Sequence, residues 1–90
     1  MQERRKIVAF SDTNNTVRVR VGSRVTIRFS DGMIEIYTIV EYAVDVDPGQ
    51  GRISQKSPLG SALIGACPGD TRSFELPEEG TETVEVISVE

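Results

Sequence analysis

The sequence ISQKSPLGSALIGACPGD, residues 53–70, decides the fold of this chain, because it holds the one pattern that predicts a helix. Ser57 is typical of a helix N-cap, since its hydroxyl can accept from a free backbone N–H of the first turn. Pro58 suits the first helical position, where its missing N–H costs nothing. We expect the helix to end at Pro68-Gly69, because proline cannot continue it and glycine takes the positive φ of a chain reversal. Its apolar face, at helical spacing, consists of Leu59, Ala62, Leu63 and Ala66.

The rest of the chain is predicted to form strands and turns. Valines alternate with arginines over residues 17–21, which is the period of a half-buried strand. Apolar residues likewise alternate with polar ones over 24–29 and predict a second strand there. Turns are expected at Asp47-Pro48-Gly49, where proline fits the second position, and at 77–80. The other predicted strands are 33–42, 52–54, 71–76 and 81–89. The last two of these, around a tight turn, predict a hairpin.

Asp31-Gly32 predicts a tight hairpin between the second and third strands, because a type I′ turn of two residues requires positive φ at both. In that register Arg28 lies across from Glu35, an attractive cross-strand pair. The apolar face then carries these pairs: Phe29 with Ile34, Ile27 with Ile36, and Val25 with Thr38. Apolar residues meet on one face and charges on the other, which favours this register.

Ninety residues are enough for one domain with one core, and we predict an α+β fold, a twisted antiparallel sheet with one short helix packed on it. Residues 1–16 are expected to be an N-terminal segment or linker with a β-like piece at 7–10, and residues 17–90 the domain. No apolar run is long enough to span a bilayer, and no signal-peptide pattern opens the chain. The single cysteine, Cys67, excludes an internal disulfide, so we expect a cytoplasmic protein.

Charge is distributed unevenly. Residues 1–28 carry a net charge of +5 and residues 29–90 a net charge of −9, which gives −4 overall. Four arginines could form a basic stripe, with only Phe29 as an aromatic neighbour: Arg18, Arg20, Arg24 and Arg28. We interpret them as a solvated, ion-paired sheet face. A stripe that displaces counterions from nucleic acid is the alternative, and we do not expect direct nucleic-acid contact.

The sequence offers little chemistry for catalysis. It has no histidine, so it holds neither a Ser-His or Cys-His pair nor a histidine metal ligand. Cys67 has no second cysteine to act as a resolving thiol. Asp45 and Asp47 lack the further ligands of an EF-hand calcium loop, and residues 49–51 lack the third glycine of a dinucleotide-binding loop. Three late glutamates share no face at strand spacing: Glu82, Glu85 and Glu90. We therefore predict a binding module, with no catalytic residue, cofactor or metal.

The order of elements and several motifs resemble the C-terminal domain of the bacterial Gre-type transcript-cleavage factors (GreA/GreB). The resemblance extends from about residue 7 to residue 89, through VGSRVTI at 21–27, the segment 37–70 and TVEVISVE at 83–90. Its most specific motifs are Ile53-Ser54, Ser57-Pro58, ALIG at 62–65 and Gly69-Asp70. It implies an FK506-binding-protein-like fold, a curved antiparallel sheet with a short helix across it.

The resemblance also implies a function. In Gre factors an N-terminal helical hairpin enters the secondary channel of RNA polymerase, and its acidic tip helps hold catalytic magnesium. This chain contains no heptad stretch, and we expect it to lack the parts that stimulate RNA cleavage. What the family's C-terminal domain does is dock on the rim helices of the β′ subunit, through a loop that matches Lys56, Ser57 and Pro58. The family usually has Asp or Asn at the position of Lys56, so this chain changes the charge at that contact.

Two other functions remain open. The nucleoside diphosphate kinase regulator family shares this domain behind a shorter coiled coil, and a regulator of that kind is one alternative. A prolyl isomerase is suggested by fold analogy alone. It requires an aromatic-lined pocket, for which three Phe, two Tyr and no Trp supply little material. No small-molecule substrate and no membrane partner are implied, and DNA binding is implied only at the level of the family.

Overall fold

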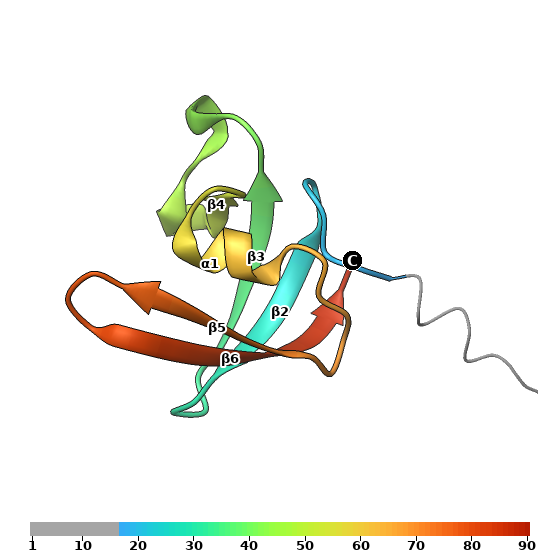
Figure 1. Ribbon diagram of the computed structural model, residues 1–90. Helices are drawn as coiled ribbons and strands as arrows, with labels where there is room; N and C mark the ends of the chain where they lie inside the picture. Colours follow the sequence, from blue (N-terminus) through green and yellow to red (C-terminus); the bar gives the residue numbers. More distant parts are fainter. Residues whose placement is uncertain (1–16) are drawn as a thin grey trace, which may run out of the picture.

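The computed structural model describes residues 17–90, which form a curled five-stranded sheet with one short helix on it (Figure 1). The predicted segment 1–16, with its β-like piece at 7–10, lies outside the described residues. The elements are β2 (Arg24–Phe29), β3 (Ile34–Val40), the 3-10 turns η2 (Ala43–Asp45) and η3 (Pro48–Gln50), β4 (Arg52–Ser54), α1 (Pro58–Leu63), β5 (Thr71–Leu76) and β6 (Gly80–Val89). The strand order is β4-β3-β2-β6-β5. The α+β prediction is confirmed, although the sheet is mixed, because β3 and β4 run parallel while the other pairs are antiparallel.

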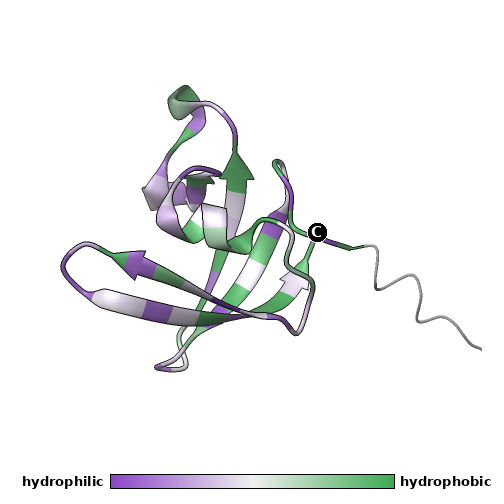
Figure 2. Ribbon diagram, in the orientation of Figure 1, coloured by the Kyte–Doolittle hydropathy of each residue, from purple (hydrophilic) through white to green (hydrophobic). Residues whose placement is uncertain are grey.

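The core lies between α1 and one face of the sheet. Hydrophobic and polar bands alternate along β2 in Figure 2, as expected for a strand with one buried face. The apolar residues predicted for the helix face all belong to the core: Leu59, Ala62 and Leu63 lie on α1, whereas Ala66, which is fully buried like Leu63, lies in the loop after it. The sheet and the described residues before β2 complete the core with Val19, Val25, Ile27, Ile39, Phe74, Val84 and Val86. Each fully buried Val, Ile or Leu side chain contributes about 1.5–3 kcal/mol.

The helix ends earlier than predicted, at Leu63 rather than at Pro68-Gly69. Gly65 has φ +86°, the left-handed conformation that commonly terminates helices. Its N–H donates to the carbonyl of Val19 at 2.8 Å, and the N–H of Val19 donates to the carbonyl of Ala66 at 2.9 Å. These bonds satisfy the backbone of the chain after the helix, so Gly65 was the stop signal that the prediction overlooked.

The same two bonds correct the prediction of a strand over 17–21. Residues 17–20 have no regular secondary structure, because their partner is the loop after α1 and not another strand. The alternation itself was informative. Val19 is 2% exposed, while Arg18 and Arg20 are exposed to solvent. Periodicity therefore identified the buried face of this segment correctly and its secondary structure wrongly.

The first hairpin forms where it was predicted, but its register is wrong by one residue. Phe29 pairs with Met33, since the N–H of Phe29 donates to the Met33 carbonyl at 2.8 Å, which leaves a loop of three residues, 30–32. Gly32 has φ +93°, and Asp31 Oδ1 accepts from the N–H of Met33 at 2.9 Å. A three-residue hairpin loop with glycine in the left-handed position is the next common type after the two-residue turn.

This shift moves Ile34 and Ile36 of the third strand to the outer face of the sheet, whereas Ile39 is buried in the core. Arg28 now lies opposite Ile34, and Ile27 opposite Glu35. As a result Ile34 and Ile36 are 58% and 48% exposed instead of buried. The predicted Arg28–Glu35 pair does not form, because this register places Arg28 and Glu35 on opposite faces of the sheet, and Arg28 makes an ion pair with Glu85 on β6 instead.

The second half of the chain follows the prediction closely. β5 has the expected bounds, and β6 begins one residue early, at Gly80. Leu76 lies opposite Gly80, so residues 77–79 form the turn of the predicted hairpin. The turn at Asp47-Pro48-Gly49 is also confirmed, as the start of η3.

Candidate functional site

The predicted docking loop, residues 56–58, connects β4 to the first turn of α1 and is braced by hydrogen bonds to Ser54. The N–H of Lys56 donates to Ser54 Oγ at 3.0 Å, and the N–H of Ser57 donates to the Ser54 carbonyl at 3.0 Å. The Ser57 hydroxyl donates to that same carbonyl at 2.7 Å and accepts from the N–H of Gly60 at 3.0 Å. The N-cap prediction for Ser57 is thus confirmed, and the cap also ties the helix to β4.

Gly60 is a structural residue of this site that the sequence analysis missed. It is buried, and a Cβ placed on it would lie 3.0 Å from both the carbonyl carbon of Ser54 and Ser57 Oγ, and closer still to the Ser54 carbonyl oxygen. The helix therefore approaches β4 more closely than any residue with a side chain permits. A glycine inside a helical pattern is unfavourable by about 1 kcal/mol relative to alanine, and its presence there was the available signal.

The structure brings the three predicted contact residues together and gives them different roles. Lys56 and Pro58 are exposed, whereas Ser57 is half-buried and its hydroxyl is used inside the protein. In the part of the chain that is described, no carboxylate pairs with Lys56. Pro58 lines a groove of about 490 Å³ between the start of α1 and the turn of the β5–β6 hairpin. The exposed part of this loop therefore consists of an ammonium group and an apolar ring.

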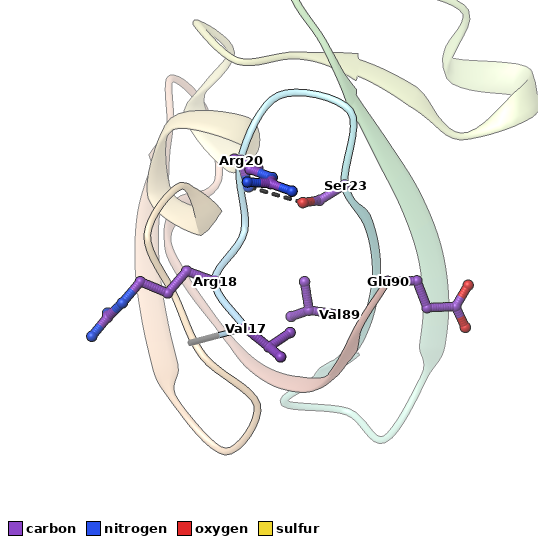
Figure 3. Close-up of a pocket in the computed structure, with 6 residues that line it drawn as sticks. All are labelled: Val17, Arg18, Arg20, Ser23, Val89 and Glu90. Carbon is purple, nitrogen blue, oxygen red and sulfur yellow. Dashed lines mark hydrogen bonds between the residues drawn. The ribbon is translucent and has the colours of Figure 1, made fainter. Parts of the chain in front are cut away.

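A second hollow, of about 390 Å³, lies between residues 17–23 and the end of β6 (Figure 3). Val17 and Val89 occupy its middle, and the backbone N–H of Arg20 donates to Ser23 Oγ at 3.0 Å. The side chains of Arg18 and Glu90 point away from it in opposite directions. Its charged groups do not converge on a common point, so this hollow shows no arrangement suited to a ligand.

Comparison with known proteins identifies the family. A family model described as "Transcription elongation factor, GreA/GreB, C-term" matches residues 14–90. This chain belongs to the GreA/GreB family. The matched residues make it the C-terminal domain of a Gre-type transcription elongation factor.

Individual relatives of this GreA/GreB domain support the family assignment. It is 49% identical over 72 residues to transcription elongation factor GreA of Thermomicrobium roseum, which covers 80% of this chain and 44% of that protein. Among solved structures, the GreA/GreB factor of Nitrosomonas europaea is 32% identical with a TM-score of 0.65, over 93% of this chain and 68% of that one. Gfh1 of Thermus aquaticus is 27% identical with a TM-score of 0.70, over 93% and 53%. The chain spans about half the length of the curated relatives it matches, or less.

Three of the four arginines of the predicted basic stripe contact a carboxylate or a backbone carbonyl of this GreA/GreB domain. Arg28 pairs with Glu85 and Arg24 with Glu90 at 4.0 Å, so the ion-paired interpretation is confirmed for these two. Arg18 donates to the Gly65 carbonyl at 3.2 Å. The groups of both ion pairs are well exposed, and such pairs contribute at most about 1 kcal/mol.

The other residues considered as catalytic or metal-binding candidates make contacts within the protein. Asp70 Oδ2 accepts from the N–H of Cys67 at 2.9 Å, and Asp47 Oδ2 lies 3.5 Å from the Arg52 guanidinium. Among residues 17–90 no three carboxylate or thiol side chains lie close enough together to hold a metal ion, and no helix is long and apolar enough to cross a membrane. Burial, and secondarily the charge of Glu35, raise the pKa of Tyr37 above its ordinary value of 10.0.

Proposed function

We propose that this GreA/GreB domain docks on RNA polymerase through residues 56–58, at the β′ rim helices beside the secondary channel. One observation carries the proposal: the loop is exposed at Lys56 and Pro58, while hydrogen bonds with Ser54 and Gly60 hold it in one conformation. A surface that is already ordered loses little conformational entropy when a partner binds. Loops held by a rigid scaffold are where binding residues concentrate.

The proposal assigns no reaction to this domain. Within residues 17–90, α1 is the one α-helix and has six residues, so this part contains no helical hairpin that could enter a channel. The carboxylates there do not gather into a metal-binding group. We therefore propose that the domain supplies attachment to the polymerase and does not by itself stimulate transcript cleavage.

The experiment measures binding of the full chain to bacterial core RNA polymerase by biolayer interferometry. We expect Pro58→Ala to weaken binding about tenfold, since it removes an exposed apolar contact from the centre of the surface. Pro48→Ala is the matched control, because Pro48 is also exposed and also begins a short helical turn. The control should bind within about twofold of wild type. Absence of wild-type binding, or equal affinity of the two variants, would contradict the proposal.

Lys56→Asp tests the orientation of docking. The family usually carries Asp or Asn here, so a polymerase surface that accepts the family's loop should prefer the carboxylate. We expect the variant to bind more tightly than wild type at low salt, with the difference reduced when salt is raised. Weaker binding of this variant would contradict docking in the family's orientation. Prolyl isomerase activity on a peptide, without polymerase binding, would favour the isomerase alternative.

A further inference from the structure

The groove beside Pro58 has a second wall, which comes from the end of the β5–β6 hairpin. Its lining residues are Pro58, Glu75, Leu76, Pro77, Gly80 and Thr81. The helix α1 packs against β5, and this contact fixes the position of the hairpin end relative to the docking loop (Figure 1). Pro58, Leu76 and Pro77 give the groove an apolar lining that is continuous with the loop proposed to dock.

The hairpin wall is strongly acidic. Residues 75–82 contain four glutamates and no basic residue: Glu75, Glu78, Glu79 and Glu82. Of these, Glu75, Glu78 and Glu79 are exposed. None of the four forms an ion pair with any residue between 17 and 90. The basic residue of β5, Arg72, lies at the opposite end of the strand, where it is 3.7 Å from Asp70.

We propose that this groove and its acidic hairpin, residues 75–82, form the second half of the docking surface and receive a basic segment of the protein partner. The inference rests on the proposed function, because it extends the surface around Pro58. An aliphatic side chain of the partner packs on Pro58, Leu76 and Pro77, and lysine or arginine side chains face the glutamates. Nucleic acid would be repelled by this wall, and these carboxylates form no metal-binding group within the described residues.

Charge indicates where the partner's basic residues lie. Glu75 lines the groove itself, and Glu78 and Glu79 are exposed in the hairpin turn beside it, so basic side chains of the partner face these three positions. Charges at the edge of an interface mainly raise the association rate and select the orientation, and they contribute less to affinity.

The test compares two charge reversals of equal size in the full chain, with bacterial core RNA polymerase as the probe. Glu78→Lys with Glu79→Lys changes the hairpin turn. Glu41→Lys with Asp45→Lys is the matched control, because these residues are also exposed and lie in the separate loop after β3. Each double variant changes the net charge equally, so long-range attraction of the whole protein cancels in the comparison. Thermal unfolding followed by circular dichroism establishes that both variants fold.

We expect the hairpin variant to associate about tenfold more slowly than the control at ~0.1 M salt, with the difference shrinking towards ~0.5 M salt. The control should stay within about twofold of wild type. Equal rates for the two variants would overturn the inference while the proposed function stands, provided that Pro58→Ala still weakens binding. Faster association of the hairpin variant would also overturn it, since the hairpin would then face an acidic surface. Absence of wild-type binding refutes the proposed function itself and removes this inference with it.

Discussion

Gly60→Ala is the substitution that tests most directly how the docking loop is held. The added methyl group would meet the backbone of Ser54 on β4 and the hydroxyl of Ser57. Backbone on one side and a hydrogen-bonded cap on the other leave no flexible side chain that can move aside. The helix must therefore shift away from β4, and the bonds that Ser57 makes to Ser54 and Gly60 must lengthen or break.

Two opposing effects determine the result. Alanine stabilises a helix by about 1 kcal/mol relative to glycine, which favours the variant. Overpacking a tight contact costs about 1–3 kcal/mol, and each lost hydrogen bond costs about 1 kcal/mol more. With both Ser57 hydroxyl bonds affected, the steric effect exceeds the helix propensity, and we expect net destabilisation of about 2–4 kcal/mol.

Urea unfolding followed by circular dichroism measures this change. The midpoint should fall by at least about 1 M with an unchanged slope, because the slope for a domain of this size is about 1–2 kcal/mol per M. Ser61→Ala is the matched control, since Ser61 is exposed on the same helix, and it should be neutral or stabilise by up to about 0.5 kcal/mol. A Gly60→Ala variant as stable as wild type would refute the close approach of α1 to β4.

Two further predictions concern stability. Ser57→Ala removes the acceptor of the Gly60 N–H and a donor to the Ser54 carbonyl, so it should destabilise by about 1–2 kcal/mol in the same urea assay, and a change within error would show that the cap is not used. Tyr37 has a pKa raised by burial, so its phenolate is disfavoured in the folded state; stability should be unaffected below pH ~10 and decline as pH rises through the folded pKa. Tyr37→Phe should lack this alkaline loss when urea midpoints are compared between pH ~9 and ~11, and an identical decline in both proteins would contradict the assignment.

The parts of the fold that the sequence predicted are those governed by local chemistry. Ser57 and Pro58 specify a helix start through the side-chain hydroxyl and the fixed φ of proline, and both act within one turn. The strand 71–76 and the turn after it were likewise marked by alternation and by proline and glycine. The start of the helix was located on the same local grounds, but the choice of residues 56–58 as a candidate docking loop came from the resemblance to the family.

The predictions that were wrong concern segments whose contacts are with residues distant in sequence. Val19 lies in an extended segment because it bonds to Gly65 and Ala66, and nothing near Val19 reveals that partner. The hairpin register failed for a related reason. Asp31-Gly32 fits loops of two and three residues, and the observed register is the one that buries Ile39 in a core completed by Val84 and Val86 of the last strand.

The proposed docking surface likewise combines features that the local sequence specifies with contacts between parts distant in sequence. Lys56 and Pro58 can be identified from the sequence, but their position is set by Gly60, which lets α1 approach β4, and by the packing of α1 on β5. The acidic hairpin becomes part of the surface only through that packing, since Glu78 is separated from Pro58 by a helix and a strand. It follows that Gly60→Ala should weaken polymerase binding even at temperatures where the variant remains folded. The contact residues would be unchanged, but the loop and the hairpin would no longer be held in register.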